Sequence, residues 1–315
     1  MYKIIQPSKI IFGIDSAKNY AYPTKCLVIT SQGTNNRDWL NYLGLEKYDI
    51  FDMVEPNPSM ETVDKILTKF DFDLFSTIIG LGGGSSLDVA KYVAFKTNKK
   101  KIMIPTTFGS GSEVTRISVL KINGKKRSFH DDKIISDVAI IDPYFINNAP
   151  LKIIKNSAID ACAQCTEAYD SKLSNIHTKF LCENAFNLLE SGIINSNYEQ
   201  LALGSLISGL GFGNCSTTLG HALSYVFSNE GISHGHALAF TTTLSHKFND
   251  SKFYSRYKKL VKYLKFESIH LEENLDEAAE IILTDRKHLD FNPKNVVKED
   301  IIEILKKIND KKFEL

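Results

Sequence analysis

Gly80-Leu81-Gly82-Gly83-Gly84-Ser85-Ser86-Leu87-Asp88-Val89-Ala90-Lys91 leads from a strand-like segment into a helix-like one. The β-branched run at 76–81 predicts a buried strand, and the pattern at 86–97 predicts a helix. Glycines let backbone N–H groups approach an anion closely, and a helix N-terminus adds positive potential. Ser85 or Ser86 is the expected helix cap. The segment therefore predicts a phosphate-binding turn, with a tight turn that binds nothing as the alternative.

The same alternation runs through the first half of the chain. Further strands are expected at 25–30, 101–105 and 138–143, and a further helix at 59–70. Strands that read as continuous apolar runs and alternate with helices are typical of a parallel sheet covered on both faces. We therefore expect an open α/β domain over residues 1–148.

The pattern changes at Asp142–Pro150, where prolines and Asn147-Asn148 interrupt it. Beyond this point helical periodicity dominates, and few segments read as strands. The second domain, residues 149–315, is expected to be all-helical, with helices at 151–170, 176–191, 197–213, 217–228, 235–248, 253–264, 275–289 and 298–311.

The composition narrows the class of protein. Of 315 residues, 43% are hydrophobic and 24% charged, which excludes a mainly disordered chain. The net charge of +1 argues against nucleic acid as the main partner. No apolar run reaches the ~18–20 residues of a membrane helix, and Pro7 and Lys9 interrupt any signal-peptide core. With five cysteines in a chain of this length, we expect a cytoplasmic protein.

A second polar turn follows the strand expected at 101–105. It reads Pro105-Thr106-Thr107-Phe108-Gly109-Ser110-Gly111-Ser112-Glu113-Val114-Thr115 and is rich in hydroxyl groups and glycine. Two such turns at strand ends in one sheet favour a dinucleotide bound in the crevice at the strands' carboxyl edge.

Candidate metal ligands gather in the second domain. Asp160 and Gln164 are four residues apart on a predicted helix and share one face, where both offer oxygen to a cation. His221, His234 and His236 fall within 16 residues next to glycine turns, which favours a metal site. The remaining histidines are isolated and are interpreted as structural: His130, His177, His246, His270 and His288.

Taken together, these motifs resemble the iron-dependent (group III) alcohol dehydrogenases. The resemblance covers about residues 1–250 and rests on Gly-Gly-Gly-Ser-Ser-Leu-Asp-Val-Ala-Lys, Pro-Thr-Thr-Phe-Gly-Ser-Gly-Ser-Glu-Val-Thr, Asp-Ala-x-x-x-x-x-Glu-Ala-Tyr and Ser-His-Gly-His-Ala, in this order. It implies a dehydroquinate synthase-like architecture, with an α/β dinucleotide-binding domain followed by a helical domain that holds one divalent metal. We also expect a homodimer with a small-molecule substrate and neither a nucleic-acid nor a membrane partner.

The resemblance implies that Asp160, Gln164, His221 and His234 are the metal ligands. The family usually has His at the position of Gln164. This chain would therefore combine two oxygen and two nitrogen donors, which suit Fe(II), Zn(II) or Co(II); Fe(II) is the expected metal. Many members also have a His where this chain has Tyr225. Tyr225 and His236 are therefore the candidates for the catalytic proton relay.

A cofactor, NADP(H) or NAD(H), is implied as well. Its pyrophosphate is expected at Gly82, Gly83, Gly84 and Ser85. The rest of the dinucleotide is expected along Asp88, Thr106, Thr107, Ser110, Ser112, Val114 and Lys126, the last being a lysine that precedes a strand. NAD-preferring members have an Asp near the position of Ser31, where it accepts from the ribose 2′-OH. Since 30–37 lacks a carboxylate, we expect a preference for NADP(H).

The implied reaction is reversible reduction of a short aldehyde to a primary alcohol, with the two domains closing over one cleft and the metal acting as a Lewis acid. Gln164 and Asn214-Cys215-Ser216-Thr217-Thr218 resemble phosphonoacetaldehyde reductases, which make 2-hydroxyethylphosphonate. Arg116, Ser216 and Thr217 are candidates to bind the phosphonate. The alternatives are reduction of succinic semialdehyde, malonic semialdehyde or butanal, an NAD-using metal-dependent lyase or cyclase of the related fold, and a non-catalytic relative.

Overall fold

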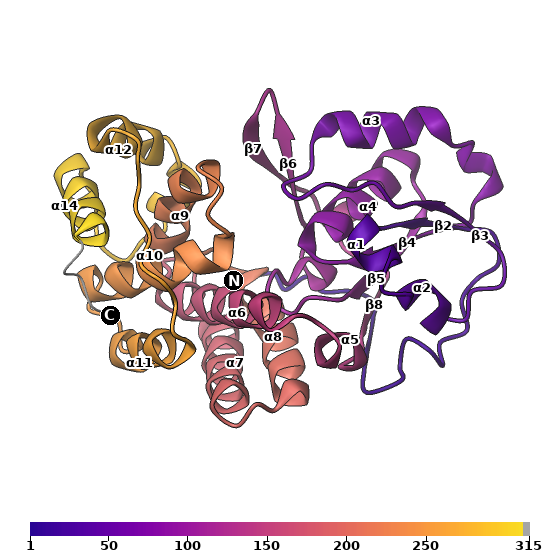
Figure 1. The fold of residues 1–315 in the computed structure, drawn as a ribbon, viewed down its shortest axis with the longest axis horizontal. Helices are drawn as coiled ribbons and strands as arrows, with labels where there is room; N and C mark the ends of the chain where they lie inside the picture. The colour runs from indigo at the N-terminus through magenta and orange to yellow at the C-terminus, as the bar shows by residue number, and fades with distance from the viewer. Residues whose placement is uncertain (311–315) are drawn as a thin grey trace. The chain divides into compact units, whose positions relative to one another are not determined.

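The computed structural model describes residues 1–310. They divide into two compact units, Met1–Pro150 and Leu151 onward. Figure 1 shows that the first unit combines strands with helices, whereas the second is built from helices. The predicted fold class, an α/β domain followed by an all-helical domain, is confirmed. Among the described residues, no helix combines the length and apolar character needed to cross a membrane.

A six-stranded parallel sheet forms the centre of the first unit, in the order β1-β8-β5-β4-β2-β3. The strands are β1 Lys9–Phe12, β2 Cys26–Ile29, β3 Tyr48–Phe51, β4 Thr77–Gly82, β5 Lys100–Pro105 and β8 Val138–Ile141. Both β2 and β4 are buried along their whole length, as their unbroken apolar sequences require. The helices of this unit are α1 Gln32–Asn35, α2 Trp39–Tyr42, α3 Met60–Lys69, α4 Gly84–Thr97 and α5 Tyr144–Asn147.

The strand order reverses between β2 and β4. From β2 the chain continues to β3 on one side, whereas from β4 it continues through α4 to β5 on the other. In open parallel sheets, ligands bind outside the carboxyl ends of the strands at such a switch point. The two turns that follow β2 and β4 are therefore the part of this unit best placed to bind a nucleotide.

A two-stranded antiparallel hairpin, which the sequence did not predict, follows the second polar turn. It consists of β6 Ile117–Ile122 and β7 Lys125–His130, and it extends away from the main sheet (Figure 1). Its tight turn is made by Asn123 and Gly124, both with positive φ, which is the residue pair that hairpin turns favour.

The second unit is a helical bundle centred on α6, which packs against α7, α8 and α10. Close approach of α7 and α8 depends on small residues, since a Cβ at Gly211 would lie 2.6 Å from Cys182 Sγ. The helix predicted to end at 311 ends at Asn309, and residue 311 itself lies outside the described residues. The helices are α6 Leu151–Asp170, α7 Ile176–Ile194, α8 Tyr198–Phe212, α9 Leu219–Asn229, α10 His234–Phe248, α11 Tyr254–Leu264, α12 Leu275–Leu283, α13 Arg286–Leu289 and α14 Lys298–Asn309.

Candidate cofactor and metal sites

The two predicted polar turns lie against each other at the carboxyl edge of the sheet. Gly82 has a φ of +149°, a conformation that favours glycine. A Cβ at Gly83 would lie 3.1 Å from Thr107 Oγ1, and one at Gly84 would lie 2.8 Å from Ser110 Cβ. The glycines after β4 are thus needed for the close approach of the hydroxyl-rich turn after β5.

The start of α4 differs from the prediction in one respect. Ser85 or Ser86 was expected to cap the helix, but the helix begins at Gly84 and its N-cap is Gly83, so no side chain caps it. The first backbone N–H groups of α4 therefore have no side-chain acceptor from the N-cap residue. Together with the partial positive charge of the helix end, this arrangement suits a phosphate group.

Two of the predicted cofactor residues, Asp88 and Ser112, are engaged in hydrogen bonds within the protein. Ser112 Oγ donates to Asp88 Oδ1 at 2.6 Å, and the backbone N–H of Val119 donates to Asp88 Oδ2 at 3.0 Å. Lys91, itself fully buried, donates to Ser112 O at 2.7 Å and to Thr115 O at 3.1 Å. Val114, another predicted cofactor residue, is buried. Asp88 and Ser112 thus hold the second turn against α4.

Lys126 does not precede a strand as the resemblance implied. It lies inside β7, where it pairs across the hairpin with Lys121. The segment 125–130 is mostly polar and exposed, and such a pattern does not indicate a strand.

An arginine that the sequence analysis did not single out lies beside Ser31. Arg37 donates to Gly33 O, and its guanidinium carbon lies 5.3 Å from the centre of the Trp39 ring. A Cβ at Gly33 would be 3.2 Å from Arg37 Nη1 and 3.9 Å from Ser31 Oγ. The turn after β2 therefore carries a positive charge, anchored by a ring and a carbonyl.

An acidic residue also lies near this turn. Asp52 follows β3, and its Oδ2 accepts from Asn35 Nδ2 at 2.8 Å. It lies outside the segment 30–37 because it follows the neighbouring strand, β3. Next to it, Met53 forms a β-bridge with Ser31.

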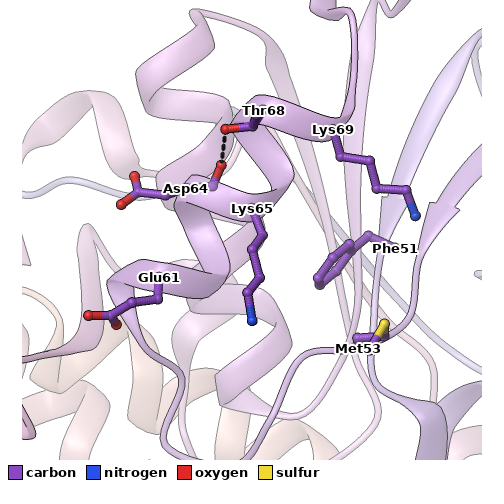
Figure 2. A pocket seen from close by; sticks show the side chains of 7 residues that line it. All are labelled: Phe51, Met53, Glu61, Asp64, Lys65, Thr68 and Lys69. Carbon is purple, nitrogen blue, oxygen red and sulfur yellow. Dashed lines mark hydrogen bonds between the residues drawn. The ribbon is translucent and has the colours of Figure 1, made fainter.

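A cavity of about 610 Å³ opens between the end of β3 and α3. Figure 2 shows Lys65 and Lys69 along its wall with Phe51 and Met53, and Glu61 and Asp64 on the same helix; Thr68 completes the lining. Two acidic and two basic side chains balance in charge, so this cavity gives no preference for an anion or a cation.

In the second unit, Asp160, His221 and His234 come together as a candidate metal site. Each offers one ligand atom, and these atoms all lie within 4.8 Å of one another. The Nε2 atoms of the two histidines are each 3.9 Å from Asp160 Oδ1. α6 supplies Asp160, α9 supplies His221, and His234 is the first residue of α10.

Two orphaned polar atoms show that this donor set fits a cation. His221 Nε2 and Gln164 Oε1 are buried and have no hydrogen-bond partner, which is costly unless something positively polarised lies there. Gln164 is also joined to the set, since its Nε2 donates to Asp160 Oδ1 at 3.0 Å. Oxygen and imidazole donors of this kind match a divalent transition metal.

The two predicted relay residues lie in different places. The Tyr225 ring stacks on His234, with ring centres 6.1 Å apart. His236, two residues after His234 and so on another face of α10, has its Nε2 2.6 Å from Glu267 O and its ring against Phe266. The structure thus brings Tyr225 to the ligands but not His236.

His288 is expected from the sequence to be isolated and structural; it is not isolated, since it lies beside the candidate ligand His221, and its structural role stays a prediction. It is 4% exposed, stacks on His221 with ring centres 6.2 Å apart and meets the edge of Tyr225. Asp285 Oδ2 lies 2.7 Å from its Nδ1. Burial lowers the pKa of His288 despite this carboxylate. It was missed because it comes from α13, more than 50 residues further along the chain.

The three proposed phosphonate-binding residues are divided between the two units. Arg116 belongs to the first unit and pairs with Asp132 at 2.9 Å. Ser216 and Thr217 lie before α9 in the second unit, where Ser216 Oγ donates to Thr217 O at 2.9 Å.

The fold and the ligand set together define a class of two-domain protein, with an α/β unit of the dinucleotide-binding type followed by a helical unit that carries a candidate Asp/His metal site. Two family models match this chain: iron-containing alcohol dehydrogenase over residues 7–143, and the C-terminal part of the Fe-containing alcohol dehydrogenase family over residues 154–280. The chain belongs to the iron-containing alcohol dehydrogenase family. This family uses NAD(P) and a divalent metal, usually iron.

Two curated relatives are named as dehydrogenases. The chain is 32% identical over 209 residues to a 4-hydroxybutyrate dehydrogenase of Clostridium kluyveri, covering 57% of this chain and 56% of the relative. It is 33% identical over 220 residues to long-chain-alcohol dehydrogenase 1 of Geobacillus thermodenitrificans, covering 60% and 56%. The matches thus span just over half the length of these relatives.

Solved structures share the fold. An iron-containing alcohol dehydrogenase from Thermotoga maritima has a TM-score of 0.87 at 23% identity, covering 98% of this chain and 99% of the other. A sulfoacetaldehyde reductase from Bifidobacterium kashiwanohense, in complex with NAD+, has a TM-score of 0.88 at 21% identity, covering 99% of each chain.

Proposed function

We propose that this protein is a metal-dependent reductase that uses NAD(P)H to convert a short aldehyde into a primary alcohol, and that phosphonoacetaldehyde is its substrate. The observation that carries the proposal is the convergence of Asp160, His221 and His234, with the orphaned Gln164 Oε1 beside them. His221 Nε2 and Gln164 Oε1 are buried polar atoms with no hydrogen-bond partner among the described residues, and a cation between them would remove the cost of burying them unpaired.

Asp160, Gln164, His221 and His234 would hold the metal. When bound, a divalent metal supplies Lewis-acid polarisation of an aldehyde oxygen. The two histidine rings are held in place at their Nδ1 atoms, by Glu167 at His221 and by Ser224 at His234. Tyr225 stacks on His234 and is the candidate to hold, at its Oη, the proton that the product alcohol receives.

The first unit would bind the cofactor at the switch point between β2 and β4. Backbone N–H groups at the start of α4 would hold the pyrophosphate at Gly82, Gly83, Gly84 and Ser85. Thr106, Thr107 and Ser110, from the turn after β5, would contact the rest of the dinucleotide. Asp88, Ser112 and Lys91 would keep that turn in position rather than contact the cofactor.

Arg37 supports the expected preference for NADP(H). Its guanidinium and Ser31 both lie next to Gly33, in the segment 30–37 that lacks a carboxylate, and an arginine at this place can accommodate the 2′-phosphate. Its planar donors suit bidentate binding of a phosphate. The nearby carboxylate of Asp52 is held by Asn35, which limits its reach toward the ribose.

An anionic substrate is supported by the names of two relatives and by one residue. 4-Hydroxybutyrate carries a carboxylate and sulfoacetaldehyde a sulfonate. In this chain Lys287 precedes His288, and burial lowers its pKa to about 8. We infer that Lys287, rather than Arg116, meets the charged end of the substrate.

The test is NADPH oxidation by metal-reconstituted protein against phosphonoacetaldehyde, succinic semialdehyde, malonic semialdehyde and butanal. We expect turnover of all four classes to require the metal and kcat/KM to be highest for phosphonoacetaldehyde. Lys287→Met should raise KM for the anionic aldehydes and leave KM for butanal unchanged. No NADPH oxidation with any aldehyde would contradict the proposal, and equal efficiency with butanal would contradict its substrate.

A further inference from the structure

Glu167 is a fully buried carboxylate beside the candidate ligands but outside the ligand set. It lies on α6, two turns after Asp160. His221 Nδ1 lies 2.5 Å from its Oε2, and the backbone N–H of Gly220 donates to its Oε1 at 2.5 Å. Thr218 adds two more hydrogen bonds, from its backbone N–H at 3.2 Å and from its hydroxyl at 3.1 Å.

These contacts keep the carboxyl group ionised. Both carboxyl oxygens accept hydrogen bonds, from the backbone N–H groups of Thr218, Gly220 and His221 and from the Thr218 hydroxyl, and such donors favour the charged, acceptor-only form. An ionised carboxylate only accepts hydrogen bonds. The proton between the two side chains therefore belongs to His221 Nδ1, and the lone pair of the ring is on Nε2.

The lone pair points to the candidate metal position. His221 Nε2 is buried, has no hydrogen-bond partner, and lies 3.9 Å from Asp160 Oδ1. The same protonation pattern follows for the second ligand ring. Ser224 uses its single O–H to donate to His221 O at 2.7 Å, so at the 3.3 Å contact with His234 Nδ1 its oxygen can only accept.

Glu167 also fixes the helix that carries His221. The N-cap residue of α9, Thr218, provides no side-chain cap of its own, and the carboxylate from α6 accepts from the backbone N–H groups there instead. Gly220 makes the approach possible, since a Cβ at this position would lie 2.6 Å from Glu167 Oε1. One buried side chain thus sets both the position of His221 and the proton on its ring.

We propose that Glu167 is a positioning residue that holds His221 in the Nδ1–H tautomer and thereby sets the affinity of the site for a divalent metal, with Ser224 holding His234 more weakly in the same way. The inference rests on the proposed metal site. A carboxylate that accepts from the far nitrogen of a ligating imidazole fixes its orientation and raises its basicity, and its loss typically costs ~10–100-fold in metal affinity.

The first experiment measures Zn(II) and Co(II) affinity of metal-stripped protein by chelator competition. Glu167→Gln keeps the shape but removes the charge, and we expect an affinity about 10–100-fold weaker. Ser224→Ala should weaken binding by less than Glu167→Gln. The matched control is Asp170→Asn, a carboxylate one turn further along α6 whose Oδ2 is 3.8 Å from His246 Nδ1; its affinity should equal that of the wild type.

The second experiment measures the tautomer of His221, which a merely structural role of Glu167 would not determine. In metal-free wild-type protein, the ¹⁵N shifts of His221 should report a protonated Nδ1 and an unprotonated Nε2, and this measurement needs no variant to fold. An Nε2–H tautomer, or wild-type metal affinity in folded Glu167→Gln, would overturn the inference. Absence of metal binding by the wild type would instead refute the proposed function.

Discussion

Gln164 is the residue at which this site departs from the usual family pattern, and its replacement separates a ligand from a structural contact. The side chain is 5% exposed, its Nε2 donates to Asp160 Oδ1 at 3.0 Å, and its Oε1 has no partner. Gln164→Leu keeps a similar volume while it removes both polar atoms.

The structure gives the expected magnitudes. In metal-free protein the variant loses one hydrogen bond, worth ~0.5–1.5 kcal/mol, but it also removes a buried unsatisfied oxygen whose desolvation costs ~1–3 kcal/mol. These effects oppose each other, so the free energy of unfolding should change by between about −0.5 and about +2.5 kcal/mol. In loaded protein the cation loses an oxygen donor, and we expect at least about tenfold weaker binding, or ~1.4 kcal/mol.

The assay combines chelator competition with urea unfolding of metal-free protein. Gln164→His serves as the matched control, because imidazole is a stronger donor and should retain or tighten metal binding. If Gln164→Leu binds metal as tightly as the wild type but unfolds with ~1–3 kcal/mol less free energy, Gln164 only braces Asp160 and is not a ligand.

Further predictions concern both units. His234→Ala should lose metal and aldehyde-reducing activity together, and full metal occupancy in the purified variant would remove His234 from the ligand set. Ser31→Asp should reverse the expected NADPH preference, because a carboxylate repels the 2′-phosphate. Arg37→Gln should weaken binding of 2′,5′-ADP and leave binding of 5′-AMP unchanged, as measured by titration calorimetry with Arg116→Gln as the control. Equal effects of Arg37→Gln on both nucleotides would contradict this role of Arg37. Lys91→Met should lower the free energy of unfolding by ~3–5 kcal/mol, because it leaves Asp88 and several buried carbonyls without their cation; a wild-type urea midpoint would show that this buried lysine contributes little.

Sequence reasoning succeeded where one local pattern specified one structure. The apolar runs of β2, β4 and β5 and the 20-residue pattern of α6 predicted elements that the structure contains. β1 and β3 were missed because they are short edge strands with partly exposed, mixed sequences, and such patterns do not distinguish a strand from a loop. The predicted helix at 275–289 is divided at Thr284, which follows α12, before α13 begins.

The residues of the candidate site that belong to local sequence motifs could be predicted. Asp160 and Gln164 follow from helical spacing, and His221 and His234 from their clustering and the family resemblance. His288, Lys287 and Asp52 could not be placed in this way, because they reach their neighbourhoods through tertiary packing from distant segments. Glu167 was visible within a motif, but its role depends on how α9 packs against α6, which no local pattern reveals.

The central claim is direct hydride transfer from the cofactor to an aldehyde at the metal-dependent site. The most direct measurement uses NADPH that carries deuterium at both C4 positions, with metal-reconstituted protein and phosphonoacetaldehyde, followed by mass spectrometry of the product. We predict one deuterium on the carbinol carbon of 2-hydroxyethylphosphonate, and none formed by metal-stripped protein. Product without deuterium, as a lyase or cyclase that regenerates its cofactor would give, or equal transfer without metal, would contradict the account.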